Sequence, residues 1–293
     1  MKVSRQFERR GPLWLPRYDV ERPLPPNPRE RGLPRFERYR RRQRIGAAWS
    51  HNNGVTNYSA SSITSLQTTL GFTPPAGSLL ICMAAGYTSS SATISVSDNS
   101  SGPADSWSSI VSAGTWSSKT LSPFQAFACN LTSGTAPTSV TVSFGSVTST
   151  YTIVVIDCYT GGPNPFQQDG NGVPQSGDST GPSASFTTGS QANDLIWCGM
   201  LTYGAPSSAS VASPFTVETQ GQSLRCNSAD DGITNSTAAS TQYTATWTLG
   251  GSSRYWCEVL AGFQAPSTSF QPDEDYWQWG PPSAPDAPAT VFE

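Results

Sequence analysis

The sequence predicts an all-β protein with two tandem antiparallel β-sandwiches of jelly-roll-like type, an extended basic N-terminal arm and an acidic Pro-rich C-terminal tail. Two observations predict the fold class. Apolar and polar residues alternate strictly in several segments, and short apolar runs are separated by clusters of Gly, Ser, Pro and Asn. An internal repeat predicts the duplication. No segment has a convincing helical period.

Alternation is clearest in "TSVTVSF" (138–144) and "QYTATWTL" (242–249), where every second residue is apolar. This pattern is typical of a strand with one buried face. The runs "LLICMAAG" (79–86) and "YTIVVIDCY" (151–159) are apolar almost throughout. They are therefore expected to form central strands that are covered on both faces.

The repeat supports two copies of roughly 105 residues each, by alignment of the printed sequence. Residues 74–87 align with 190–203, which places Cys82 opposite Cys198, and residues 151–159 align with 255–263, which places Ile156 opposite Leu260. A chain of this length is able to form two sandwiches, each with its own core. The predicted organisation is a docking arm at 1–48, a first sandwich at 49–163, a second at 164–263 and an acidic aromatic tail at 264–293.

The net charge of -3 conceals a strong asymmetry. Residues 1–48 hold 14 of the 17 Lys and Arg residues against five acids, which is 14 - 5 = +9. The remaining chain holds three basic residues against 15 acids, which is 3 - 15 = -12. Opposite charge at two ends of one chain favours contacts between copies, or docking on an acidic partner.

Few residues suggest catalysis or metal binding. The six cysteines have no zinc-type spacing, and they are expected to be buried, reduced and without a cofactor. The only histidine, His51, is expected to be a solvated turn residue. Two acidic pairs, Asp98 with Asp105 and Asp230 with Asp231, are expected to stabilise turns, with calcium binding as the alternative. We therefore expect a non-enzymatic protein.

The β region (49–263) resembles structural proteins of tailed bacteriophages and prophages, namely capsid decoration, head-fibre and minor tail proteins. The resemblance rests on an opening strand of the type "ANDLI", a "VSDNS…W" turn (Val96–Trp107), a Thr/Val strand and a closing aromatic-aliphatic strand. It implies a structural role in the virion, assembled in the host cytoplasm, with a capsid or tail protein as partner and a homo-oligomeric state. The arm and the tail lie outside this resemblance.

The arm and the tail contain the residues expected to dock on partners. Seven prolines lie from Pro12 to Pro34, and this density favours extended polyproline II. Arginines and aromatics are enriched at protein interfaces. The arm therefore suits a strap laid over neighbouring subunits. The predicted docking residues are Trp14, Tyr18, Arg35, Phe36, Arg38, Tyr39, Arg40, Arg41, Arg42, Arg44, Tyr276, Trp277 and Trp279.

Two alternatives remain open for function. A carbohydrate-binding adhesin or minor tail protein for host attachment would use Asp98, Trp107 and Trp116 as candidate glycan-binding residues. A coat protein would hold the genome with its basic arm, which makes nucleic acid a weaker candidate partner, because acids are interleaved with the arginines. No membrane partner is expected, since the most apolar run, Leu79–Ala85, is too short to cross a bilayer.

Overall fold

A computed structural model describes residues 49–100, 106–116, 119–131, 136–189, 195–231 and 240–265. Every helix or strand in these ranges is a β-strand, and the strands pair antiparallel, which confirms the all-β prediction. Among these residues there is no helix with the length and hydropathy needed to span a membrane. The predicted arm and all but two residues of the predicted tail lie outside the described residues.

The first half of the described chain forms one large and one small sheet. The first large sheet has the strand order β1-β9-β3-β7-β5, with β6 also paired to β7, and the first small sheet has the order β2-β8-β4. Their bounds are Ser50–Ser59 (β1), Ser65–Thr69 (β2), Leu79–Thr88 (β3), Ser95–Asp98 (β4), Ser108–Ser109 (β5), Gly114–Trp116 (β6), Lys119–Asn130 (β7), Ser139–Ser143 (β8) and Ser149–Thr160 (β9).

The second half has the same plan. The second large sheet has the order β10-β18-β13-β16-β15, with β11 also paired to β18, and the second small sheet has the order β12-β17-β14. Their bounds are Gln168–Asn171 (β10), Gln175–Ser179 (β11), Ser183–Thr187 (β12), Leu195–Tyr203 (β13), Ala209–Val211 (β14), Thr216–Gly221 (β15), Cys226–Asp230 (β16), Gln242–Leu249 (β17) and Arg254–Phe263 (β18).

The paired strands of the two halves also share a register. In the first half Cys82 lies opposite Ile156 across β3 and β9. In the second half Cys198 lies opposite Leu260 across β13 and β18. These are the residues that the sequence repeat aligns with one another. The predicted boundary between residues 163 and 164 stays a prediction.

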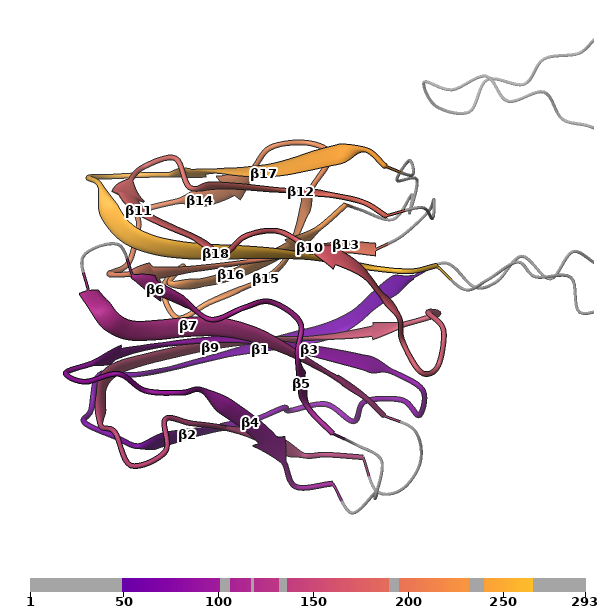
Figure 1. The fold of residues 1–293 in the computed structure, drawn as a ribbon, viewed down its shortest axis with the longest axis horizontal. Coiled ribbons are helices and arrows are strands. Elements are labelled where there is room, and N and C mark those ends of the chain that lie inside the picture. Colours follow the sequence, from indigo (N-terminus) through magenta and orange to yellow (C-terminus); the bar gives the residue numbers. More distant parts are fainter. Residues whose placement is uncertain are drawn as a thin grey trace, which may run out of the picture. The chain divides into compact units, whose positions relative to one another are not determined.

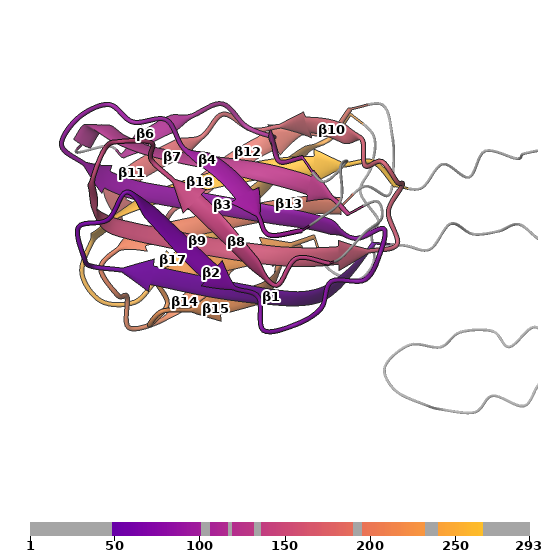
Figure 2. The same ribbon diagram turned by 90° about the horizontal axis from the view of Figure 1, so that it is seen from below.

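The four sheets stack as layers in the order small, large, large, small (Figure 1). Seen from below, the strands of the first small sheet cross obliquely over those of the first large sheet (Figure 2). Each large sheet is thus covered on both faces. Accordingly β3, β9, β13 and β18 are buried over almost their whole length, which the continuous apolar runs predict for β3 and β9.

The hydrophobic core between the two large sheets is a feature that the sequence did not predict. It draws side chains from both halves, including Met83 and Val155 from the first and Trp197 and Val259 from the second. Separate clusters lie between each large sheet and its own small sheet. The two halves therefore share a core in addition to the ones expected within each sandwich, and burial of this apolar surface stabilises their contact.

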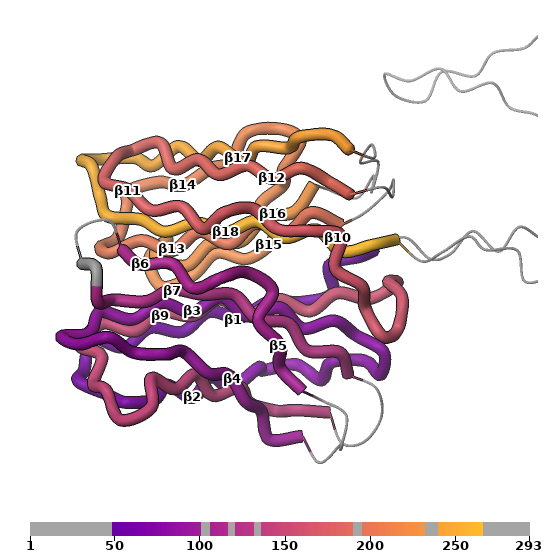
Figure 3. Tube along the Cα trace, viewed as in Figure 1, coloured from indigo at the N-terminus to yellow at the C-terminus, as the bar shows by residue number. Residues whose placement is uncertain are grey.

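The described chain begins and ends at the same end of this β core. The indole Nε1 of Trp49 donates a hydrogen bond to the backbone oxygen of Gln264 over 3.1 Å. The Trp49 ring also meets that of Phe263 edge-on, with 6.3 Å between centroids. The tube in Figure 3 shows the end of β18 beside the start of β1.

Candidate functional site

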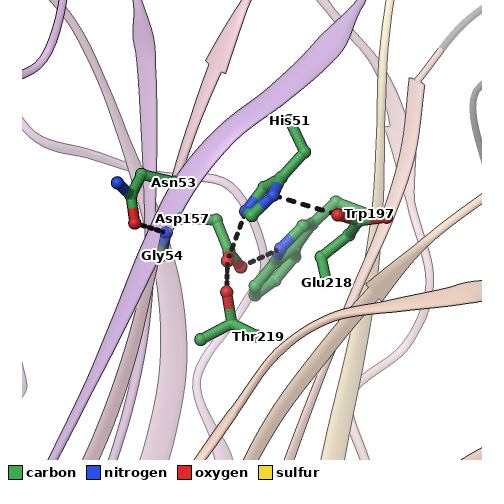
Figure 4. A network of polar contacts seen from close by, with 7 residues as sticks. All are labelled: His51, Asn53, Gly54, Asp157, Trp197, Glu218 and Thr219. Carbon is green, nitrogen blue, oxygen red and sulfur yellow. Dashed lines mark hydrogen bonds and ion pairs between the residues drawn. The ribbon is translucent and has the colours of Figure 1, made fainter.

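A network of buried polar groups joins the two large sheets (Figure 4). Asp157 on β9 is fully buried and lies at its centre. One carboxylate oxygen, Oδ2, accepts a hydrogen bond from Trp197 Nε1 over 2.7 Å. The other, Oδ1, accepts one from the hydroxyl of Thr219 over 2.5 Å and lies 3.2 Å from His51 Nε2. The second imidazole nitrogen, Nδ1, lies 2.9 Å from Oε2 of Glu218.

A β-bulge in β1 directs two residues of this strand toward the second large sheet. His51 lies opposite Tyr159 and Gly54 lies opposite Asp157, with a register shift between His51 and Asn53. Residues three apart normally face opposite sides of a strand, but the extra residue of a bulge reverses this parity. The side chain of Asn53 accepts a hydrogen bond from the backbone N–H of Gly54 next to this irregularity.

Two glycines allow β1 and β15 to approach closely at the network. A Cβ atom on Gly54 would lie 1.8 Å from Thr219 Oγ1 and 2.7 Å from Asp157 Oδ1. On the other strand, a Cβ atom on Gly221 would lie 1.9 Å from Thr56 Oγ1. Each strand thus presents a glycine to a threonine of its neighbour. Because neither glycine has a side chain, β1 and β15 come close enough for Thr219 to reach Asp157.

The surroundings of His51 favour its protonated form. Burial by itself lowers the pKa of the imidazole, but the hydrogen bonds and negative charge of Asp157 and Glu218 outweigh it and raise the pKa to about 9. The ring is therefore an imidazolium at neutral pH. An imidazolium between two carboxylates has no lone pair with which to accept a proton, so this group is a poor general base. The prediction of a solvated turn residue is wrong, because β1 places the side chain against both large sheets.

The hydroxyl of Thr219 does not form a nucleophile–base pair with His51. It donates to Asp157, whereas an activated hydroxyl nucleophile is hydrogen-bonded to the base itself. The arrangement is that of a buried ion pair with neutral donors around it. Such a network fixes the relative position of the two sheets, since each donor and acceptor has a defined partner.

A second buried carboxylate lies within the second half, between its large and small sheets. Glu258 on β18 is fully buried, and its Oε1 accepts a hydrogen bond from the thiol of Cys198 over 3.2 Å. The indole of Trp247 donates in turn to that sulfur over 3.4 Å. Burial raises the pKa of Glu258 to about 8, although its contacts with Cys198 and Trp247 act in the opposite direction. By the repeat alignment, Val154 occupies the equivalent place in the first half.

The six cysteines are all buried, as the sequence predicts, and the structure places none of them in a disulfide within its described ranges. Burial raises the pKa of Cys158 to about 11 and that of Cys226 to about 12. Thiols of this kind are almost entirely protonated at neutral pH. Because the thiolate is the reactive form, these side chains act as small hydrophobic groups.

The candidate glycan-binding residues do not form an exposed platform. Trp116 is only 3% exposed and packs into the core between the large sheets, so the structure corrects its prediction as a stacking surface for a sugar. Trp107 is partly buried against the core of the first half. Its Nε1 donates to Asp98 Oδ2 over 2.8 Å, which ties the predicted carboxylate to the fold.

The predicted acidic pairs behave as turn and strand residues where they are described. Asp98 also accepts a hydrogen bond from the backbone N–H of Ser100, which is the local contact expected of a turn. Asp231 accepts one from the backbone of Ile196. Asp105 lies outside the described residues. Within the described residues, no group of three or more metal-ligating side chains occurs.

None of the predicted docking residues lies in the described part of the chain. They are Trp14, Tyr18, Arg35, Phe36, Arg38, Tyr39, Arg40, Arg41, Arg42, Arg44, Tyr276, Trp277 and Trp279. Sequence reasoning, for its part, missed the network around Asp157. One signal was present, because an acid inside the apolar run "YTIVVIDCY" indicates a buried carboxylate that needs partners.

Comparisons of the chain with protein-family models, with curated proteins and with solved structures found no match. The function is therefore argued from the residues and their geometry.

Proposed function

We propose that the chain is a non-enzymatic structural protein of a bacteriophage virion, of the capsid decoration or head-fibre type, attached to the particle through residues 1–48. The two repeated halves form the outer body. The arm supplies the contact with a capsid or tail protein, and copies associate with one another on the particle. The proposal rests on the resemblance of the β region and on the physical features below.

The contact between Trp49 and Gln264 carries the proposal. It brings the point where the basic arm joins the β core next to the point where the acidic tail joins it. Attachment at one end of the core leaves its opposite end available to project from a surface. An arm of 48 residues in polyproline II conformation spans on the order of 100 Å, which is enough to cross neighbouring subunits.

The chemistry of the described residues favours a mechanical role. His51 and Asp157 are held in an ion pair between the large sheets, and Glu258 and the thiols are buried. Weak arm contacts repeated over many copies would together give firm attachment, because each bound contact raises the effective concentration of the next.

The test uses particles assembled from the structural proteins encoded beside this chain. Full-length protein should sediment with the particles, and a variant lacking residues 1–48 should remain in the supernatant while its circular dichroism stays that of a β protein. A variant lacking residues 266–293 serves as the matched deletion control. Normal particle binding by the variant without the arm would overturn the proposal.

Two arm variants separate a protein partner from the genome. Replacing Trp14, Phe36 and Tyr39 with Ala should weaken binding to empty particles if the arm lies on protein, because aromatic anchors dominate such interfaces. Replacing Arg40, Arg41 and Arg42 with Gln should weaken binding to a protein partner and to nucleic acid alike. If the arginine variant binds empty particles normally but loses binding to particles that contain nucleic acid, and if this binding depends steeply on salt, the genome-binding coat protein is favoured instead.

A further inference from the structure

Five tyrosines form a cluster that crosses the boundary between the two halves. Tyr58 and Tyr151 stack with 4.9 Å between ring centroids, and Tyr151 meets Tyr203 at 4.5 Å. Tyr203 in turn meets Tyr87 at 5.6 Å and lies directly opposite Tyr255 in the register of β13 and β18. We call this set the tyrosine patch. It lies at the start of β18, and therefore at the end of the β core opposite to Trp49 and Phe263.

The outer part of the tyrosine patch is exposed apolar surface. Tyr203 is 42% exposed and Tyr255 is 38% exposed. Leu121, which is 44% exposed, lies at the same end of the β core, because its carbonyl accepts a hydrogen bond from Thr88, the residue after Tyr87. Of the four exposed large hydrophobic side chains found among the described residues, three thus gather at this end, and only Val173 lies elsewhere. Such gathering is typical of an interaction surface.

Positive charge accompanies these rings. The guanidinium of Arg225 lies over the ring of Tyr58, 4.9 Å from its centroid. The guanidinium of Arg254 lies beside Gly204, the residue after Tyr203, with 3.5 Å between its Nη1 and the position of a Cβ atom on that glycine. These arginines are two of the three Lys and Arg residues between positions 49 and 265. The Nε atoms of both arginines have no hydrogen-bond partner among the described residues. One carboxylate opposes them, since Asp178 lies opposite Tyr255 across β11 and β18.

We propose that the tyrosine patch binds the chain's own acidic aromatic segment, "DEDYWQW" (273–279). Arginine pairs with carboxylates and stacks on aromatic rings, and tyrosine surfaces accept aromatic partners edge to face. The segment supplies three acids and three aromatics within seven positions and no base. Exposed Trp and Tyr side chains are unfavourable in water, so this contact buries apolar surface on both partners.

The chain is long enough for this contact. The last described residue, Ala265, lies at the far end of β18, so a returning segment must travel back along about ten residues of strand, or on the order of 33 Å. The segment begins eight residues after Ala265 and ends 14 residues after it. At about 3.3 Å per extended residue these positions reach roughly 26–46 Å, which brackets the distance required.

The test is photo-crosslinking in the full-length protein, with a benzophenone amino acid in place of Tyr276. Mass spectrometry should locate the crosslinks on peptides that contain Tyr203 or Tyr255, and the product should migrate as a monomer at all concentrations. Crosslinks to other surfaces, or none to the core, would overturn the proposal. A crosslinked dimer that increases with concentration would overturn the assignment to the chain's own tail and favour a second copy.

Hydrogen exchange in the full chain provides an independent measurement. The double variant Tyr203→Ser/Tyr255→Ser should lower the protection of residues 273–279 from exchange by at least about tenfold. Truncating aromatic side chains at the centre of an interface commonly weakens binding by this factor or more. Val173→Ser is the matched control and should leave protection unchanged. Should the double variant unfold, two single variants replace it. Arg225→Gln should lower the protection of residues 273–279, because it removes a positive charge, and Asp178→Asn should raise it, because it removes a negative one. Unchanged protection in a folded patch variant contradicts the proposal. This contact does not depend on a virion role, so either proposal is able to fail alone.

Discussion

Trp197 of the second half donates its indole N–H to Asp157 of the first half over 2.7 Å, inside the core that joins the two large sheets. A buried carboxylate is costly unless it is paired and hydrogen-bonded. Here the pairing comes from His51 on the same sheet, and two of the hydrogen bonds come from the opposite sheet. The charge of Asp157 is therefore satisfied only when the two halves are in contact, so the network specifies how they pack.

Replacing Asp157 with Asn should destabilise the protein by about 3 kcal/mol, because it leaves His51 without its buried counter-charge. Chemical denaturation measures this loss. Glu218→Gln is the matched control, since its side chain is 18% exposed and its pair with His51 is screened, so we expect a loss of about 1 kcal/mol or less. Equal losses in the two variants would show that Asp157 has no special place in the network.

The stability of the protein should fall as the pH rises from about 6.5 to about 9. The folded-state pKa of His51 is raised above its unfolded value, so its contribution is complete below 6.5 and is lost as the pH passes through the folded pKa. The full change is at most about 3 kcal/mol, because solvent screens part of the interaction of this half-buried ring. His51→Gln should remove this component. Because His51 is the only histidine, its titration is resolved directly by NMR, and a midpoint near 6.5 would refute the ion pair.

Glu258→Gln should stabilise the protein at pH 8 but have little effect at pH 4. The pKa of this carboxyl is raised in the folded state, so the folded protein retains a proton that the unfolded chain loses above about 4.5, and stability declines until about pH 8. The variant lacks this decline and should be at least about 2 kcal/mol more stable at pH 8. If the difference in stability between the variant and the natural protein is the same at pH 4 and pH 8, the raised pKa of Glu258 is contradicted.

The decline expected from Glu258 overlaps that of His51 between pH 6.5 and 8. Comparing the two single variants with the double variant separates the contributions. Their effects should add, because the side chains lie in different layers, His51 between the large sheets and Glu258 between the second large and small sheets.

Gly54→Ala should destabilise the protein by about 2 kcal/mol or more, since the new methyl group would overlap Thr219 Oγ1 and force β1 and β15 apart. Gly181→Ala is the matched control. Its new Cβ atom would come no closer than 4.0 Å to a neighbouring atom, Trp247 O, and we expect a change within about 0.5 kcal/mol. Equal thermal midpoints for the two variants would mean that the strands accommodate the methyl group.

The sequence was sufficient to predict the all-β class and several of the strands. Alternation identified β8 and β17, and continuous apolar runs identified β3 and β9 as central strands. These features were predictable because period-two burial is a local property of the chain.

The contact between the two large sheets was not predictable in the same way. A run such as "YTIVVIDCY" shows that a strand is buried on both faces, but not which layer covers each face. The partners of Asp157 come from positions 51, 197 and 219, and only the folded arrangement brings them together. Trp116 illustrates the converse error, since a tryptophan beside a loop was interpreted as surface and is core.

The six cysteines should be unreactive in the folded protein and should all react after unfolding. Each is buried, and burial raises the pKa of Cys158 and Cys226 to about 11 and 12, so little thiolate exists at pH 8. With a chromogenic disulfide reagent, denatured protein should release six equivalents rapidly. The native protein should react only as it unfolds, and Gly54→Ala should therefore accelerate the reaction whereas Gly181→Ala should not. One or two thiols reacting at once in the native state would show that a layer of the stack opens separately.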